Sequence, residues 1–489
     1  MPEPDQGLDR QGEAAAAQGQ APAGPPPSFA SALAFWFKLG WISFGGPAGQ
    51  IALMHQEIVE RRRWIDEQRF LHALNFCMLL PGPEAQQLAT YIGWMLHRTW
   101  GGVVAGLLFV LPSLFILILL SWLYVSHGDA PLVAALLWGV KPAVVAVVVA
   151  AVQRIGRRVL QHRLLWAISA AAFVALAVFD LPFPLVIGAA AALGWWGRVR
   201  WAPVLAAGAG GKAPVTAPMT VPAMPGADTP RALPPAPALD RPQAAADASR
   251  RSAGRAAGVC LALGLLAYAG LVAAFGVDGT LTTMAAFFTQ AALLTFGGAY
   301  AVLPFVVQGA VEQHQWLSAA QMIDGLALGE TTPGPLIMVV AFVGFLGGWG
   351  QTPFGADQPL LAGIAGACVA TGFTFLPSFL FILGGAPLVE RSRGVAALAA
   401  PLTAISAAVV GVILNLAVYL AVQVLWPGGA APHGGGIDWA AVRFGQTDFG
   451  ALIIGLGAGA LLWRGRLGVV PVIALAGVAG LVLRGVIGA

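Results

Sequence analysis

The sequence predicts an all-α polytopic integral membrane protein. Only 10% of its 489 residues are Asp, Glu, Lys or Arg, against roughly 25% in soluble proteins. The apolar residue types make up 58% of the chain, and a soluble fold could not hide that much apolar surface. The apolar runs would make about 13 helices of the ~20 residues that a bilayer requires. A water-soluble enzyme is therefore excluded as a first interpretation.

The apolar segments form a group of six and a group of seven. The first group occupies about 30–52, 70–96, 101–125, 131–152, 163–179 and 182–197, and the second 256–276, 281–306, 322–350, 359–385, 395–424, 450–463 and 467–486. The stretch between them is rich in Pro and Ala and cannot pack a core. We expect a disordered cytoplasmic tail (1–28), a first half (29–200), a cytoplasmic linker (201–255), an extra transmembrane segment (256–278) and a second half (279–489).

The two halves are related in sequence. A shift of 252 residues aligns Phe44-Gly45-Gly46 with Phe296-Gly297-Gly298, and Pro81-Gly82-Pro83 with Pro333-Gly334-Pro335. After an insertion the shift becomes 265 and aligns Ser113 with Ser378. One extra segment between the copies means that the second copy enters the membrane from the opposite side. The sequence therefore predicts two inverted-topology homologous halves, as in secondary transporters.

Arginine placement predicts the orientation. We expect the chain to lie in a bacterial-type inner (plasma) membrane with a cytoplasmic N-terminus and linker and an external C-terminus. The Arg-rich loops near 154–163, 198–200, 391–393 and 464–466 are then all on the cytoplasmic side. The loop with Arg61, Arg62, Arg63 and Arg69 is the exception, because it would be external if every apolar segment crossed the membrane once. It also becomes cytoplasmic if the first two segments are re-entrant at Gly45-Gly46-Pro47 and Pro81-Gly82-Pro83. The equivalent loop near 313–321 has no Lys or Arg and would be external.

Four motifs accompany the breaks: SFGGPAGQ (43–50), LLPGPEAQQLATYIG (79–93), TFGGAYAVLP (295–304) and ETTPGPL (330–336). With the half-chain repeat they closely resemble the chromate ion transporter family in its long two-domain form. The resemblance covers the chain from Phe35 to the final segments. It implies a secondary transporter, an antiporter that exports chromate, a sulfate-like oxyanion, at the expense of the proton motive force and so gives chromate resistance.

The residues independently suggest an anion site. A helix that restarts after Gly-Gly or Pro-Gly-Pro presents unpaired N–H groups and the positive end of its dipole. Two of only three lysines lie in or beside apolar segments, where a charge costs at least ~2.5 kcal/mol, although both could instead reach the interface as amphipathic side chains. The expected substrate-binding residues are Lys38, Ser43, Gly45, Gly46, Gln50, Pro81, Gly82, Pro83, Gln86, Gln87, Lys141, Thr295, Gly297, Gly298, Thr331, Thr332, Pro333, Gly334 and Pro335. If Lys38 contacts the substrate, Lys38→Gln should abolish chromate resistance.

Proton coupling needs a group that changes charge inside the membrane. Glu84 directly follows the first Pro-Gly-Pro and Glu330 precedes the second by three residues, so these two are the candidates. Glu330 is the better one, because the helix dipole would hold Glu84 ionised. Glu57, His55 and His72 are weaker candidates because they approach the Arg-rich loop, where salt bridges are the plainer interpretation.

No other chemistry is indicated. The chain has no HExxH, GxSxG or complete phosphate-loop motif, so no enzyme activity, cofactor or metal is expected. The net charge of +4 does not suggest nucleic acid, and the three cysteines form no CxxC pair. The alternatives to a chromate exporter are a carrier of sulfate or another tetrahedral oxyanion in either direction, and an anion channel. The oligomeric state stays open, with a homodimer as one option.

Overall fold

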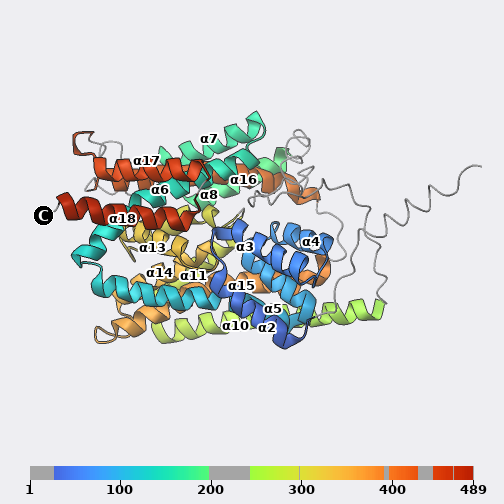
Figure 1. The fold of residues 1–489 in the computed structure, drawn as a ribbon. Coiled ribbons are helices and arrows are strands. Elements are labelled where there is room, and N and C mark those ends of the chain that lie inside the picture. The colour runs from blue at the N-terminus through green and yellow to red at the C-terminus, as the bar shows by residue number, and fades with distance from the viewer. Residues whose placement is uncertain are drawn as a thin grey trace, which may run out of the picture.

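The computed structural model describes residues 27–197, 243–296, 298–389, 396–427, 444–465 and 467–487, and every regular element in these ranges is a helix (Figure 1). The first half contains α2 (Phe29–Ile42), α3 (Gly46–His55), the π-helical turn η1 (Gln56–Arg61), α4 (Glu67–Cys77), α5 (Glu84–His127), α6 (Pro131–Val159), α7 (Arg163–Ala177) and α8 (Phe183–Gly197). The second contains α10 (Gln243–Phe275), α11 (Thr280–Leu294), η2 (Ala299–Ala301), α12 (Leu303–Val307), η3 (Gln308–Gln313), α13 (Ala319–Thr331), η4 (Leu336–Met338), α14 (Val339–Gln351), α15 (Pro359–Val389), α16 (Ala396–Leu425), α17 (Phe449–Trp463) and α18 (Val469–Ile487). Residues 1–26 of the predicted tail and 201–242 of the predicted linker lie outside the described residues, whereas 243–255, the end of the predicted linker, forms the helical start of α10.

The helices differ widely in length. Within the described ranges, α5, α6, α10, α15 and α16 contain stretches long and apolar enough to cross a bilayer. The remaining apolar helices contain shorter apolar stretches of 10–17 residues. The all-α membrane fold predicted from composition is confirmed, whereas the number of crossings remains a prediction.

Helix α5 doubles back on itself near its start. His97 and Arg98 leave the helical conformation, with φ of −136° and +55°. The parts on either side then pack tightly together, since a Cβ on Gly93 would clash with the Gly101 carbonyl oxygen. The second half repeats this contact between α14 and α15, where a Cβ on Gly344 would clash with the carbonyl oxygen of Gly366.

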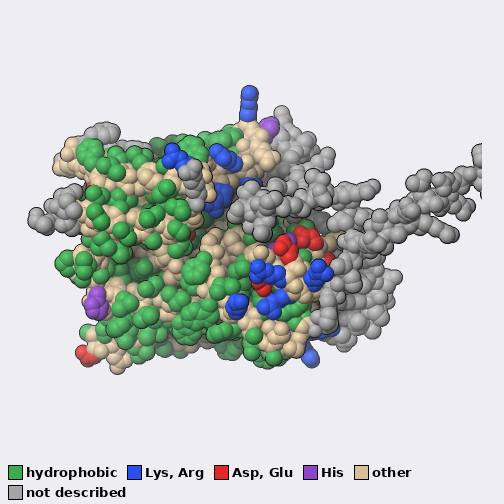
Figure 2. Space-filling view, viewed as in Figure 1, with side chains coloured by type: hydrophobic (Ala, Val, Ile, Leu, Met, Phe, Trp, Pro, Cys, Tyr) green, Lys and Arg blue, Asp and Glu red, His purple; other side chains and the backbone are tan. Residues whose placement is uncertain are grey.

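The breaks of the first half leave two pairs of short helices at one end of the molecule. The chain between α3 and α4 and the turn after the first part of α5 both lie at this end, where Phe29 at the start of α2 contacts His97 at 5.3 Å. We call it the arginine face, because it carries Arg61, Arg62 and Arg63. Figure 2 shows Lys and Arg side chains over this end of the visible surface and almost none at the other end.

The short helices of the second half return to the opposite face, which holds residues 314–318 and 352–358. There Phe275 at the end of α10 contacts Phe354 at 5.5 Å. The equivalent long helices α5 and α15 pack antiparallel: a Cβ on Gly102 would meet Leu383 at 3.0 Å, and one on Gly106 would meet Phe379 at 2.5 Å.

Two layers of helices result (Figure 1). One layer contains α6, α7, α8, α16, α17 and α18, in which α7 and α8 pack on α16 while α17 and α18 pack on α6. The other contains the long helices α5, α10 and α15 with the short helices beside the breaks. Each half therefore exchanges its last two helices with the other half, so the halves are intertwined.

Candidate functional site

The helix breaks of the two halves meet in the interior of the protein. The Gly82 N–H donates to the Thr295 carbonyl at 2.8 Å, and the Gly334 N–H donates to the Ser43 carbonyl at 2.8 Å. These two hydrogen bonds are equivalent under the sequence repeat, because Gly82 aligns with Gly334 and Ser43 with Thr295. Each Pro-Gly-Pro break is thus joined to the Gly-Gly break of the other half.

The backbone at these junctions requires glycine. Gly82 has φ of +123° and Gly334 has φ of +110°, a region that side chains disfavour. A Cβ on Gly82 would lie 2.5 Å from the Ser378 Oγ, and a Cβ on Gly334 would lie 2.7 Å from the Ser113 Cβ. Ser113 and Ser378 are also equivalent in the repeat, so both junctions have the same tight packing.

The hydroxyl groups beside the breaks are already used as donors. Ser43 Oγ donates to the Leu39 carbonyl at 2.6 Å, and Thr295 Oγ1 donates to the Ala291 carbonyl at 2.7 Å. Thr331 and Thr332 bond in the same way to carbonyls of the last turn of α13. These hydroxyls cap the C-terminal ends of the interrupted helices. The donors that remain near the breaks are backbone N–H groups and the Ser113 hydroxyl, which finds no partner among the described residues.

Helix N-termini supply those N–H groups. Helix α3 begins after Gly45 and α5 begins after Pro83, and neither first turn receives a side-chain cap. In the second half the chain restarts at Leu336 and continues into α14. The positive ends of these dipoles therefore lie beside the joined breaks.

Three buried glutamines lie near the breaks, and two of them hydrogen-bond to break residues. Gln50 Nε2 donates to the Gly334 carbonyl and, at 3.2 Å, to the Ser43 carbonyl. Gln87 Nε2 donates to the Pro81 carbonyl at 2.7 Å and to Ser378 Oγ at 3.3 Å, and Gln86 bonds to Thr90 at 3.0 Å. The Oε1 atoms of all three find no donor among the described residues. A buried acceptor is costly to leave unpaired, so these positions are suited to water or to a protonated ligand oxygen.

The two candidate carboxyls have different surroundings. Glu330 is buried at the end of α13, and its Oε1 accepts a hydrogen bond from Tyr300 at 2.6 Å. Glu84 is half-buried at the first position of α5 and has no hydrogen-bond partner within the described part of the chain. Two arginines of α6 act on them electrostatically, Arg154 on Glu330 and Arg158 on Glu84.

The two lysines have different surroundings. Lys38 is exposed on the outer face of α2 beside the exposed Phe37, while Ser43 and Leu39 face inward. Lys141 forms an ion pair with Asp324, with 3.3 Å between Nζ and Oδ2. Substrate contact by either lysine stays a prediction, and the arrangement argues against it, because α2 turns Lys38 outward and Asp324 already neutralises Lys141.

Asp324, Tyr124 and Tyr300 are polar residues that the sequence-based site omitted. Tyr124 donates to Asp324 at 3.0 Å, and Tyr300 donates to Glu330. The signal for Asp324 was present, since an acidic residue inside an apolar segment is unusual. Gly297, in contrast, lies outside the described residues, and its expected role remains a prediction.

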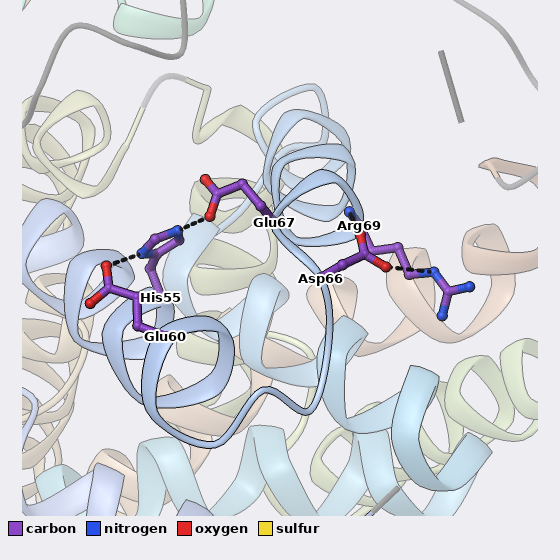
Figure 3. A network of polar contacts seen from close by, with 5 residues as sticks. All are labelled: His55, Glu60, Asp66, Glu67 and Arg69. Atoms are coloured by element: carbon purple, nitrogen blue, oxygen red, sulfur yellow. Dashed lines mark hydrogen bonds and ion pairs between the residues drawn. The ribbon is translucent and has the colours of Figure 1, made fainter. Parts of the chain in front are cut away.

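The Arg-rich loop forms its own ion-pair network. His55 contacts Glu60 at 3.2 Å and Glu67 at 2.5 Å, as Figure 3 shows beside the pair of Asp66 and Arg69 at 3.4 Å. Glu57 bonds to Arg61 at 2.6 Å and to Arg62 at 3.3 Å. Partial burial alone would raise the pKa of Glu57, but the hydrogen bonds from these two arginines outweigh burial and hold the pKa below its usual range. Glu57 therefore stays ionised at neutral pH and is unsuited to carrying a proton.

Comparison with known proteins gives the family. The family model described as Chromate transporter matches residues 30–195 and 282–481, one region in each half. A chromate transport protein of Pseudomonas aeruginosa is 33% identical over 463 residues, which cover 93% of this chain and 92% of that protein. A chromate transport protein of Cupriavidus metallidurans is 28% identical over 390 residues, covering 79% and 81%. No solved structure matches this chain. The matches span both halves and the site between them, and the chain therefore belongs to the chromate transporter family.

Proposed function

We propose that this protein exports chromate from the cytoplasm in exchange for protons, and so gives chromate resistance. The observation that carries the proposal is the reciprocal pair of hydrogen bonds joining Gly82 to Thr295 and Gly334 to Ser43. It brings helix N-termini and their N–H groups together inside a membrane protein, which suits a tetrahedral dianion. The proposed substrate contacts are the backbone N–H groups at the four breaks, with Gln50, Gln86 and Gln87 reaching the anion through water, and Glu330 is the proposed proton carrier.

Uptake into everted inner-membrane vesicles tests this function. Respiration acidifies the interior of such vesicles, and an exporter should then accumulate chromate inside. Collapsing the proton gradient should abolish accumulation. Chromate flux that ignores the gradient would favour an anion channel, and stronger inhibition by sulfate than by chromate itself would favour a sulfate carrier.

We propose an inverted-repeat topology with the arginine face in the cytoplasm. The antiparallel packing of α5 on α15 supports the inversion, and the arginines of one face support the orientation. In this arrangement the short helices of the first half re-enter from the cytoplasm and those of the second half from outside.

Gln68 and Ala320 test the topology, because they are equivalent in the repeat and both are exposed. In a background without Cys77, Cys260 and Cys368, we expect Gln68→Cys to react with an impermeant thiol reagent only from the cytoplasmic side. Ala320→Cys should react only from outside. Labelling of both cysteines from one side would exclude the inverted arrangement.

Lys38→Gln is expected to keep most chromate transport, because the side chain is exposed on the outer face of α2. The measurement is chromate accumulation in vesicles with matched protein amounts. Gln290, the equivalent residue of the second half, is also exposed, and Gln290→Ala is the matched control. Loss of transport by a normally inserted Lys38→Gln protein would return Lys38 to the substrate site.

A further inference from the structure

The two faces of the protein differ in how their short helices pack. Helix α13 packs on α6 and α18 as well as on α14, and α12 packs on α16 and α8. Their counterparts in the repeat, α4 and α3, make their main interhelical contacts with α5. The short helices of the second half therefore pack against the layer of α6 and α16 as well as within their own layer.

One ion pair joins α13 to that layer. Lys141 of α6 and Asp324 of α13 lie 3.3 Å apart, with 24% and 3% of their side chains exposed. Tyr124 of α5 donates a hydrogen bond to the same Asp324 oxygen and packs edge-on against Phe342 of α14 at 5.3 Å. Three helices of the layered fold thus converge on one buried carboxylate.

The arginine face has no equivalent pair in the described part of the chain. The repeat places His72 at the position of Asp324 and Ser406 at the position of Lys141. His72 lies on α4, in the outer pair of short helices at the arginine face. Within the described residues this ion pair therefore belongs to the opposite face, whose short helices also pack against α6 and α16.

The groups around Asp324 define what its protonation would change. Lys141 faces it from α6 and Tyr124 faces it from α5. Helix α14 carries no titratable side chain, and Arg484 of α18 lies over the Trp138 ring at 4.9 Å. Asp129 acts electrostatically on Tyr124. Lys141 is thus the main counter-ion of Asp324. Neutralising one member of a buried ion pair leaves the other charge uncompensated, which strongly disfavours the packed arrangement.

We propose that Asp324 and Lys141 form a proton-operated latch of the transport cycle. While Asp324 is ionised, the pair holds α13 against α6 and keeps the opposite face closed. When Asp324 takes up a proton from the external water at that face, Lys141 loses its counter-ion and α13 is released. The proton adds to the carboxylate and leaves it again when the pair re-forms. This inference rests on the proposed exchange of chromate for protons.

Ser121 offers a reporter position for the latch. It is fully buried on α5, three residues before Tyr124, so a cysteine there should react from the external face only when the latch opens. In a Ser121→Cys protein without the native cysteines, the labelling rate is divided by that of the exposed Ala320→Cys at the same pH, because only the thiolate reacts. We expect this ratio to be low at neutral pH and higher in mild acid. Adding Asp324→Asn should make labelling about tenfold faster at neutral pH, within the range of typical coupling energies, and should remove the response to acid.

Matched variants separate the latch from a folding defect. Asp357→Asn changes an exposed carboxyl on the same face and should leave labelling unchanged. The exchanged pair Asp324→Lys with Lys141→Asp should restore slow labelling. The proposal would be overturned if Asp324→Asn left the labelling rate of Ser121→Cys unchanged. It would also be overturned if labelling of Ser121→Cys with Asp324 and Lys141 intact did not depend on pH. The assay needs no substrate, so failure of chromate transport by the wild type would refute the proposed function without deciding the latch.

Discussion

Replacing Gly334 by alanine is expected to abolish chromate transport and to lower the amount of folded protein. Gly334 has φ of +110°, and strain of this kind costs on the order of 1–3 kcal/mol. The added Cβ would also lie 2.7 Å from the Ser113 Cβ, and overpacking costs roughly another 1–3 kcal/mol. Relief of either strain would displace the N–H that bonds to Ser43. Size-exclusion chromatography measures the amount of folded protein, and chromate uptake into vesicles measures transport.

Gly372 supplies the control for this substitution. It lies on an exposed face of α15, and a Cβ there would meet nothing within 4 Å. Gly372→Ala should therefore leave both folding and transport unchanged, whereas Gly82→Ala should resemble Gly334→Ala because of the repeat. A Gly334→Ala protein with wild-type transport would show that the junction of the breaks is not part of the pathway.

The breaks themselves could be predicted from the sequence. Gly45-Gly46-Pro47 and the two Pro-Gly-Pro motifs interrupt helices for local reasons, since proline lacks an N–H and glycine adopts positive φ. The half-chain repeat also predicted which breaks are equivalent. Their hydrogen bonds across the halves could not be predicted, because a repeat shows that two segments are alike but not that they touch.

Side-chain direction was the main limit of sequence reasoning. In a soluble helix, polar residues mark the exposed face, but a membrane helix is apolar on both its buried and its lipid-facing sides. Nothing in the sequence of α2 therefore shows that Lys38 points outward while Ser43 points inward. For the same reason, the partner of Lys141 could not be found until α6 and α13 were placed side by side.

Glu330→Gln is expected to abolish proton-driven accumulation of chromate while exchange of chromate across the membrane survives. Glu330 is buried and bonds to Tyr300 at 2.6 Å, and glutamine preserves an acceptor oxygen for that bond while fixing the charge at zero. The variant should mimic the protonated carrier, so it can still move the anion in both directions but cannot return a proton. Uptake driven by a pH gradient, compared with exchange of labelled for unlabelled chromate, measures the two activities separately.

Two further variants determine whether the effect belongs to the proton. Tyr300→Phe removes the hydrogen bond but keeps the carboxyl, so it should alter the pH dependence of uptake without abolishing accumulation. Glu84→Gln should weaken structure or binding, because Glu84 occupies the first position of α5 and interacts favourably with the helix dipole. If Glu330 carries the proton and Asp324 operates the latch, Glu330→Gln will keep the acid response of the Ser121→Cys reporter that Asp324→Asn loses. Accumulation of chromate by Glu330→Gln in response to a pH gradient, at the wild-type level, would instead leave Asp324 as the coupling carboxyl of this chain.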